Sequence, residues 1–212
     1  MARDPAGESD ELLRLSWIPM YRSRLTVDPG FLAEYATRRQ VESTGVELSN
    51  RGGWQSPDLL TDFARDAKCR QVLDELEALI RRFVEAYKGV DRPEGGVSAP
   101  FDLEIGNLWA NLNGPGDWNA GHHHPGAHIS GVFYAQAPED CGELVVRPPY
   151  TFLDVVLDVV TQPSVQPEAG MVLLFPSDVY HYMEPNRGTG TRISYAFNAR
   201  YRPRSLGGRT FL

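Results

Sequence analysis

Apolar residues follow a helical period in one long segment of the first half of the chain. In residues 70–88 they recur at i, i+3, i+4 and i+7, which places them on one face of a helix, and Gly89 supplies a C-terminal stop. Asp28 and Pro29 predict the N-cap and first residue of a second helix over FLAEYATRRQ. Residues 15–27 are expected to be extended and to add a strand to a later sheet.

The pattern changes near residue 98. Beyond it, short runs rich in β-branched and aromatic residues alternate with glycine and proline turns, which is typical of a sandwich or a barrel. We therefore expect one mainly β domain over residues 1–212, with a helical and extended support layer in 1–98 and a β core in 99–205. The predicted strands of the core cover residues 102–113, 128–137, 142–148, 170–175 and 192–201.

Histidines cluster in the second half of the chain, where four of the five lie within residues 122–128. Side chains alternate on an extended chain, so His122 and His124 face the same way, with Cα atoms roughly 6–7 Å apart. His181 follows a second apolar run, so a third imidazole can reach the same cation from another strand. Imidazole suits Zn, Cu, Fe and Ni alike, so these residues predict a metal site without choosing the metal.

A guanidinium and a hydroxyl follow the last histidine closely, at Arg192 and Ser194. If their strand is a neighbour of the one that ends near His181, both side chains point into the same cavity. A guanidinium binds a carboxylate in bidentate fashion, and the hydroxyl adds one hydrogen bond. A metal beside a carboxylate receptor suits a 2-keto diacid, because one end chelates the metal while the guanidinium holds the other.

Five short motifs surround these residues in order along the chain. They are GGWQS (52–56), NAGHHHPGAHISGVFY (119–134), GEL (142–144), FPSDVYH (175–181) and RISYAFN (192–198). Together they resemble the motifs of the 2OG-Fe(II) oxygenase family, within the 2-oxoglutarate- and Fe(II)-dependent dioxygenase superfamily. The resemblance implies a double-stranded β-helix, the cupin-like jelly roll, with supporting helices.

The resemblance also implies an activity. It implies a non-haem iron enzyme that uses Fe(II), 2-oxoglutarate and O₂, and that hydroxylates a small molecule while 2-oxoglutarate is decarboxylated to succinate. In this reading Arg192 holds the C5 carboxylate, assisted by Ser194 and Tyr134. The implied ligands of Fe(II) are His122, His124 and His181, and the implied residues around 2-oxoglutarate are Arg192, Ser194, Tyr134 and, at its keto-acid end, Asn111.

The chain departs from the wider superfamily at one ligand. Most members use His-x-Asp/Glu…His, whereas residue 124 is histidine here and no acidic residue lies between 118 and 138. Three neutral imidazoles leave the iron one charge more positive than two imidazoles and a carboxylate, which should raise its potential. The histidine also fills the space that halogenases keep for chloride, so we expect hydroxylation rather than halogenation.

The same histidines fit a second pattern, that of the cupins. A cupin would be a metal dioxygenase, an isomerase or a sugar-binding module that does not use 2-oxoglutarate, and His128 would be one of its ligands. The absence of the usual glutamate and the presence of Arg192 count against it. A non-catalytic jelly-roll binding protein would have no use for an open metal site beside a carboxylate receptor. The cupin spacing is carried by Gly116, His122, His124 and His128, then Gly170, Pro176, Asp178 and His181.

Composition and charge exclude several classes of binding partner. The net charge of −7 and the absence of a basic cluster argue against nucleic acid. No apolar run approaches the roughly 20 residues that cross a bilayer, and residues 1–17 lack the features of a signal peptide. Cys69 and Cys141 have no CxxC partners, so neither a thiolate zinc site nor a disulfide framework is expected. We therefore expect a cytoplasmic enzyme with a small-molecule substrate and no membrane partner.

Overall fold

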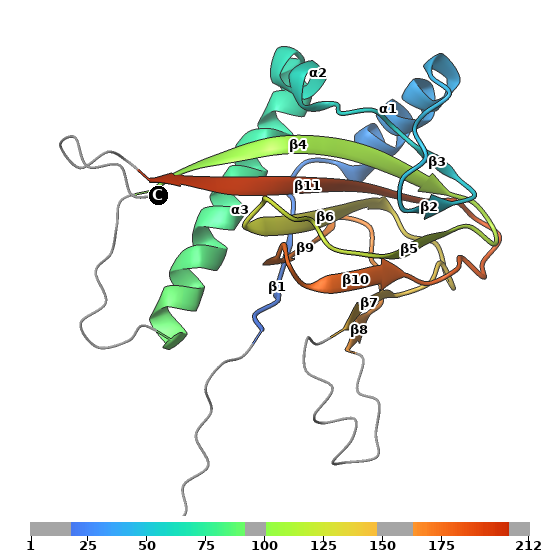
Figure 1. The fold of residues 1–212 in the computed structure, drawn as a ribbon. Coiled ribbons are helices and arrows are strands. Elements are labelled where there is room, and N and C mark those ends of the chain that lie inside the picture. Colours follow the sequence, from blue (N-terminus) through green and yellow to red (C-terminus); the bar gives the residue numbers. More distant parts are fainter. Residues whose placement is uncertain (1–17, 92–100, 148–162, 204–212) are drawn as a thin grey trace, which may run out of the picture.

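Two antiparallel sheets face each other in the computed structural model, which describes residues 18–91, 101–147 and 163–203 (Figure 1). The six-stranded sheet has the order β1-β9-β6-β11-β4-β3, and the five-stranded sheet has the order β2-β5-β10-β7-β8. The elements are β1 Tyr21–Arg24, α1 Pro29–Glu42, β2 Asn50–Arg51, β3 Trp54–Gln55, α2 Leu60–Arg65, α3 Ala67–Asp91, β4 Phe101–Asn113, β5 Trp118–His122, β6 Ile129–Gln136, β7 Leu144–Arg147, β8 Ser164–Val165, β9 Met171–Pro176, β10 Tyr180–Met183 and β11 Arg192–Pro203.

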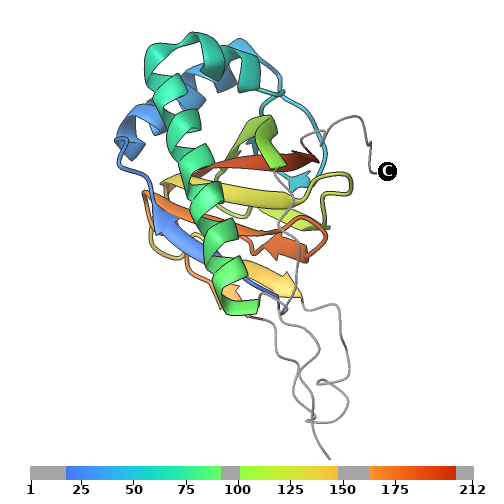
Figure 2. The same cartoon turned by 90° about the vertical axis from the view of Figure 1, so that its left-hand side faces the viewer.

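The helices cover the outer face of the six-stranded sheet, and α3 crosses its strands (Figure 2). The predicted apolar stripe of α3 is buried from Val72 to Phe83. The helix continues through Gly89 to Asp91, so the predicted stop at Gly89 is wrong. A glycine inside a helix costs only about 1 kcal/mol, which the packing of an amphipathic face outweighs.

The shorter elements of the first half hold both sheets together. As predicted, Asp28 caps α1 by accepting a hydrogen bond from Gly30 N at 2.9 Å, and residues 21–24 add a strand, β1, beside β9. The segment between α1 and α2 contributes β2 to the five-stranded sheet and β3 to the six-stranded sheet. Gly52 and Gly53 lie between these strands with φ of 67° and 65°, a backbone conformation that glycine adopts at little cost.

The predicted mainly β architecture with flanking helices is confirmed. All five predicted core strands are present, as β4, β6, β7, β9 and β11. The sequence pattern missed β5 and β10, which lack apolar alternation and form because each is paired along its length with neighbours. The predicted boundary near residue 98 lies outside the described residues. Among the described residues, no helix combines the length and apolar character that a bilayer crossing requires.

The central strands β4 and β11 divide their side chains between two environments. Leu108, Ala110 and Leu112 belong to the core beneath the helices. The alternate residues Trp109 and Asn111 face the second sheet and line a cavity between the two sheets. This inner face positions the candidate site.

Candidate metal and co-substrate site

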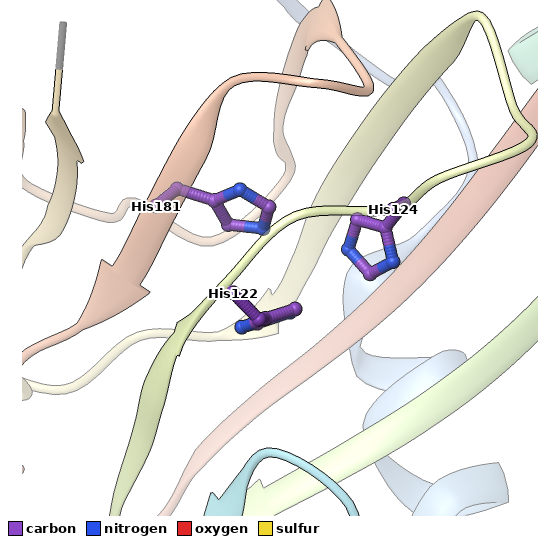
Figure 3. Close-up of side chains that lie close together, drawn as sticks. All are labelled: His122, His124 and His181. Atoms are coloured by element: carbon purple, nitrogen blue, oxygen red, sulfur yellow. The ribbon is translucent and has the colours of Figure 1, made fainter. Parts of the chain in front are cut away.

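Three histidines come together on the five-stranded sheet. His122 ends β5, His124 lies in the connection that follows, and His181 is on β10 directly opposite His122 (Figure 3). Their ligand nitrogens all lie within 4.8 Å of one another. Sequence reasoning brought the same three residues together but placed His181 at the end of the preceding apolar strand. It lies instead on β10, because the turn after β9 carries the chain from the six-stranded sheet into the five-stranded sheet.

Backbone carbonyls orient two of the three imidazoles. His122 Nδ1 lies 2.7 Å from Ala120 O, and His181 Nδ1 lies 2.9 Å from Val179 O. A carbonyl oxygen only accepts, so Nδ1 carries the proton in both rings and Nε2 keeps its lone pair. This is the arrangement that fixes histidine ligands around a metal in proteins.

Burial keeps the three rings in the form that binds a metal. It lowers the pKa of His124 to about 3, with smaller contributions from His122 and His181. Burial likewise lowers the pKa of His181 to about 4 and takes the pKa of His122 below its usual 6.5. Near neutral pH all three are uncharged, so a cation does not have to displace protons.

The other two histidines of the cluster lie elsewhere. His123 and His128 are both exposed. The ring of His128 packs at 5.8 Å from that of Tyr201, and its Nδ1 accepts from Tyr201 N at 3.3 Å. The structure therefore does not assemble the cupin ligand set, which requires His128.

A cavity opens beside the three histidines between the sheets. Side chains of both sheets contribute to its wall, and within the described residues none of them is charged. Two predicted co-substrate residues, Asn111 and Ser194, are part of the wall. Asn119 and Ser130, which lie within the sequence motif of residues 119–134, also line the wall, although the motif by itself predicts no role for them. The wall consists of Ser49, Trp109, Asn111, Asn119, His122, His124, Ser130, Gly131, Val132, Leu144, Phe175, His181, Met183, Ser194 and Ala196.

Arg192 and Tyr134 lie behind this wall, both with 0% exposed surface. Tyr134 donates its hydroxyl hydrogen to Met183 Sδ at 3.3 Å. Arg192 precedes Ser194 by two residues on β11, on the same face of the strand. The strand β11 is not a neighbour of β9, the strand before His181, because it pairs with β4 and β6. Ser194 and the imidazoles line one cavity because they lie on facing sheets.

The charge of Arg192 has no carboxylate partner among the described residues. One terminal nitrogen donates to Cys141 O and, at 3.2 Å, to Glu184 O, while Nε and the other terminal nitrogen make no hydrogen bond there. Burial lowers the pKa of Arg192, and Tyr134, Cys141 and Asp117 oppose this effect. A buried cation with unused donors is costly unless an anion completes it. The site therefore fits a carboxylate.

Comparison with known families decides the class of protein. Residues 107–198 match the family model described as "Putative 2OG-Fe(II) oxygenase". This part of the chain carries the sequence pattern of the 2OG-Fe(II) oxygenase family. The predicted family, and with it a 2-oxoglutarate-dependent dioxygenase that uses Fe(II), 2-oxoglutarate and O₂, is confirmed. No protein with a curated description matches the sequence.

Solved structures of 2-oxoglutarate oxygenases share the fold. A prolyl-4-hydroxylase from Pseudomonas putida is 20% identical, with 88% of this chain and 93% of that chain covered and a TM-score of 0.58. The α-ketoglutarate-dependent epimerase SnoN from nogalamycin biosynthesis is 16% identical, with 91% and 86% covered and a TM-score of 0.61. A prolyl hydroxylase from Trichoplax adhaerens is 13% identical, with 85% and 83% covered and a TM-score of 0.56. The predicted double-stranded β-helix is confirmed.

Proposed function

We propose that this oxygenase hydroxylates a small molecule, with Fe(II) on His122, His124 and His181 and the C5 carboxylate of 2-oxoglutarate on Arg192. One observation carries the proposal. Three neutral imidazoles, that of His181 buried and those of His122 and His124 partly buried, converge within 4.8 Å beside a cavity. A buried guanidinium that has no carboxylate partner among the described residues lies behind the wall of that cavity.

The donor set of the three histidines fits iron. Imidazole is among the ligands that non-haem iron accepts, and three protein ligands leave positions for the co-substrate and O₂. When bound, the iron supplies the redox chemistry that couples O₂ to oxidative decarboxylation of 2-oxoglutarate. The chain's own contribution is to keep Nε2 of His122 and His181 aimed at the metal and to surround the site with uncharged walls.

The unused donors of Arg192 fit the far carboxylate of 2-oxoglutarate. Ser194 is its neighbour on the same face of β11 and can add one hydrogen bond from the cavity wall. Tyr134 is directly opposite Ser194 on β6, so its hydroxyl belongs to the same end. Asn111 is directly opposite Ser194 and lines the same cavity, so its amide Nδ2–H can donate to the keto-acid end of 2-oxoglutarate.

A small-molecule substrate is favoured by the cavity. Its wall combines Trp109 with uncharged hydrogen-bonding groups such as Ser49 and Asn119, and no charged side chain of the described residues faces it. Such a wall suits a neutral, partly apolar group at the reacting position. SnoN, of similar fold at a TM-score of 0.62 and 14% identity, has been solved with Fe³⁺, α-ketoglutarate and nogalamycin RO. The prolyl hydroxylases make a peptide the competing possibility.

The test is anaerobic titration of the protein with Fe(II) and then 2-oxoglutarate. The wild-type protein should develop the weak visible charge-transfer band of the chelate, and His181→Ala should not. His123→Ala is the matched control, because His123 is in the same loop but exposed, and it should keep the band. A wild-type protein that retains a metal but gives no band with 2-oxoglutarate would contradict the proposal.

A further inference from the structure

The inner face of the six-stranded sheet holds a group of buried polar atoms without hydrogen-bond partners among the described residues. They are Gln55 Oε1, Asn111 Oδ1, both amide atoms of Asn113, and Nε and one terminal nitrogen of Arg192. Buried polar groups are almost always bonded to protein, water or a ligand. The donors among them, Asn113 Nδ2 and the two nitrogens of Arg192, are the atoms that can bond to an anionic ligand, because a carboxylate only accepts.

Strand pairing shows that these residues are neighbours. Asn113 on β4 is directly opposite Arg192 on β11. Two residues earlier on β4, Asn111 is paired with Gln55 of β3 on one side and with Ser194 of β11 on the other. Directly opposed residues share a face of the sheet, with Cβ atoms about 4.5–5.5 Å apart. The alternate residues Trp54, Leu112 and Ile193 pack in the core beneath the helices, so the unused polar groups belong to the opposite face. Asn113 is thus the residue of β4 directly opposite Arg192, on the same face of the sheet.

The side chain of Asn113 makes no hydrogen bond within the part of the chain that the structure describes. Its exposed surface is only 1%, and its backbone oxygen already accepts a hydrogen bond from Asn186 Nδ2 at 3.0 Å. The next position across the sheet is Gly53, where an added Cβ would lie 3.0 Å from Asn113 Nδ2. The amide therefore lies between Gly53 and a buried cation, and neither of its polar atoms has a hydrogen-bond partner among the described residues.

We propose that Asn113 is a further positioning residue for 2-oxoglutarate, with its amide Nδ2–H donating to the C5 carboxylate beside Arg192. The inference rests on the proposed function, which assigns that carboxylate to Arg192. A carboxylate has about four lone-pair sites. Two unused donors of Arg192, the Ser194 hydroxyl and the Asn113 amide would satisfy them. As a neutral donor, Asn113 adds a hydrogen bond without cancelling the positive charge that attracts the anion.

The test compares two 2-oxo acids that differ only at the far end. Dissociation constants of the Ni(II)-loaded protein for 2-oxoglutarate and for 2-oxopentanoate, which lacks the second carboxylate, are measured by calorimetry without turnover. Wild type should prefer 2-oxoglutarate. Asn113→Leu should reduce that preference by about tenfold, with 2-oxopentanoate binding unchanged, because one charge-assisted hydrogen bond is lost. Its ligand-free Tm should be equal or higher, since an apolar side chain of similar size removes two unbonded groups.

A matched control is Asn198→Leu. Asn198 is a buried asparagine of β11 whose amide is bonded, accepting from Ser130 Oγ at 2.7 Å and donating to Asn107 Oδ1 at 3.0 Å. Its replacement should lower Tm and leave the preference for 2-oxoglutarate unchanged. Asn113→Asp, which keeps the shape and adds a negative charge, should reduce the preference more than Asn113→Leu and serves if the leucine variant does not fold.

The outcomes separate the two proposals. If wild type prefers 2-oxoglutarate and both Asn113 variants keep that preference, the assignment of Asn113 is overturned while the role of Arg192 stands. If wild type binds the two acids equally, the carboxylate site itself is wrong and the proposed function fails with it.

Discussion

The two faces of the six-stranded sheet differ in chemistry although they belong to the same strands. On the outer face, Leu108, Leu112 and Phe197 are buried against the helices and carry no polar atom. On the inner face, Asn113 and Arg192 are just as buried but keep polar atoms that nothing in the described structure satisfies. Neighbouring residues of the same strands therefore have different roles: one set packs in the core, and the other presents polar atoms to the space between the sheets.

The outer face contributes to the stability of the fold, whereas the inner face lowers the stability of the ligand-free protein. The outer face gains from every apolar contact, at roughly 25 cal/mol per Å² buried. On the inner face, each buried polar group without a hydrogen bond lowers the stability of the ligand-free protein by about 1–3 kcal/mol, and a bound ligand that bonds to the group removes this cost. Such a face is typical of a site that is built in advance for its ligand. Substitutions on the two faces should therefore affect different measurements.

The largest effect on folding is expected at Phe197, which is fully buried on the outer face of β11. Phe197→Ala should lower the free energy of unfolding by about 3–5 kcal/mol, because it leaves a cavity in a closely packed core. Denaturant titration measures this loss. The affinity of the remaining folded protein for 2-oxoglutarate should change by less than about twofold. A parallel loss of affinity would mean that the two faces are not independent.

The converse effect is expected at Arg192. Arg192→Met should weaken 2-oxoglutarate binding by about 100-fold or more, since the carboxylate loses a buried, charge-assisted partner. Stability of the ligand-free protein should be unchanged or higher, because an uncompensated buried charge is removed. The Kd and the KM for 2-oxoglutarate are the readouts. Arg200→Met, at an exposed position of the same strand, is the control and should alter neither.

A smaller effect is expected from pH. The unfolded chain binds protons at histidine below about pH 6.5, whereas His124 and His181 have folded-state pKa values of about 3 and about 4. Their contribution to the stability of the metal-free protein is thus complete above pH 6.5 and declines as the pH falls toward 4. Unfolding measurements from pH 7.5 to 4.5 should show this slope, and His124→Phe should flatten it. An identical slope in the variant would contradict the assignment.

No effect on the metal is expected at His128, which is exposed and bonded to Tyr201. His128→Ala should bind Fe(II) as the wild type does, measured by metal content after dialysis. This variant separates the oxygenase from a cupin, since a cupin would lose a ligand. Loss of iron from His128→Ala would place the metal on a different set of histidines.

Much of the site could be predicted because its signals are local. The spacing of His122 and His124, the apolar run before His181 and the motif around Arg192 are all readable along the chain. The strands that hold the histidines were harder to predict. β5 and β10 have no apolar alternation of their own and form only because pairing partners are available on both sides. Apolar periodicity predicts a strand only when one of its faces is packed in the core. It therefore does not predict strands such as β5 and β10, whose residues are chosen for the metal site.

The sequence by itself determined the mainly β class, the central helix, the family and the three histidines as a group, because periodicity and motif spacing are properties of the chain. Only the tertiary structure decided that Ser194 and the histidines meet from opposite sheets, that His128 is turned away, and that Asn113 is enclosed beside Arg192. The physical reason is that strand register and sheet order arise from contacts between residues far apart in sequence. A buried polar atom without a partner becomes visible only when all its neighbours are in place.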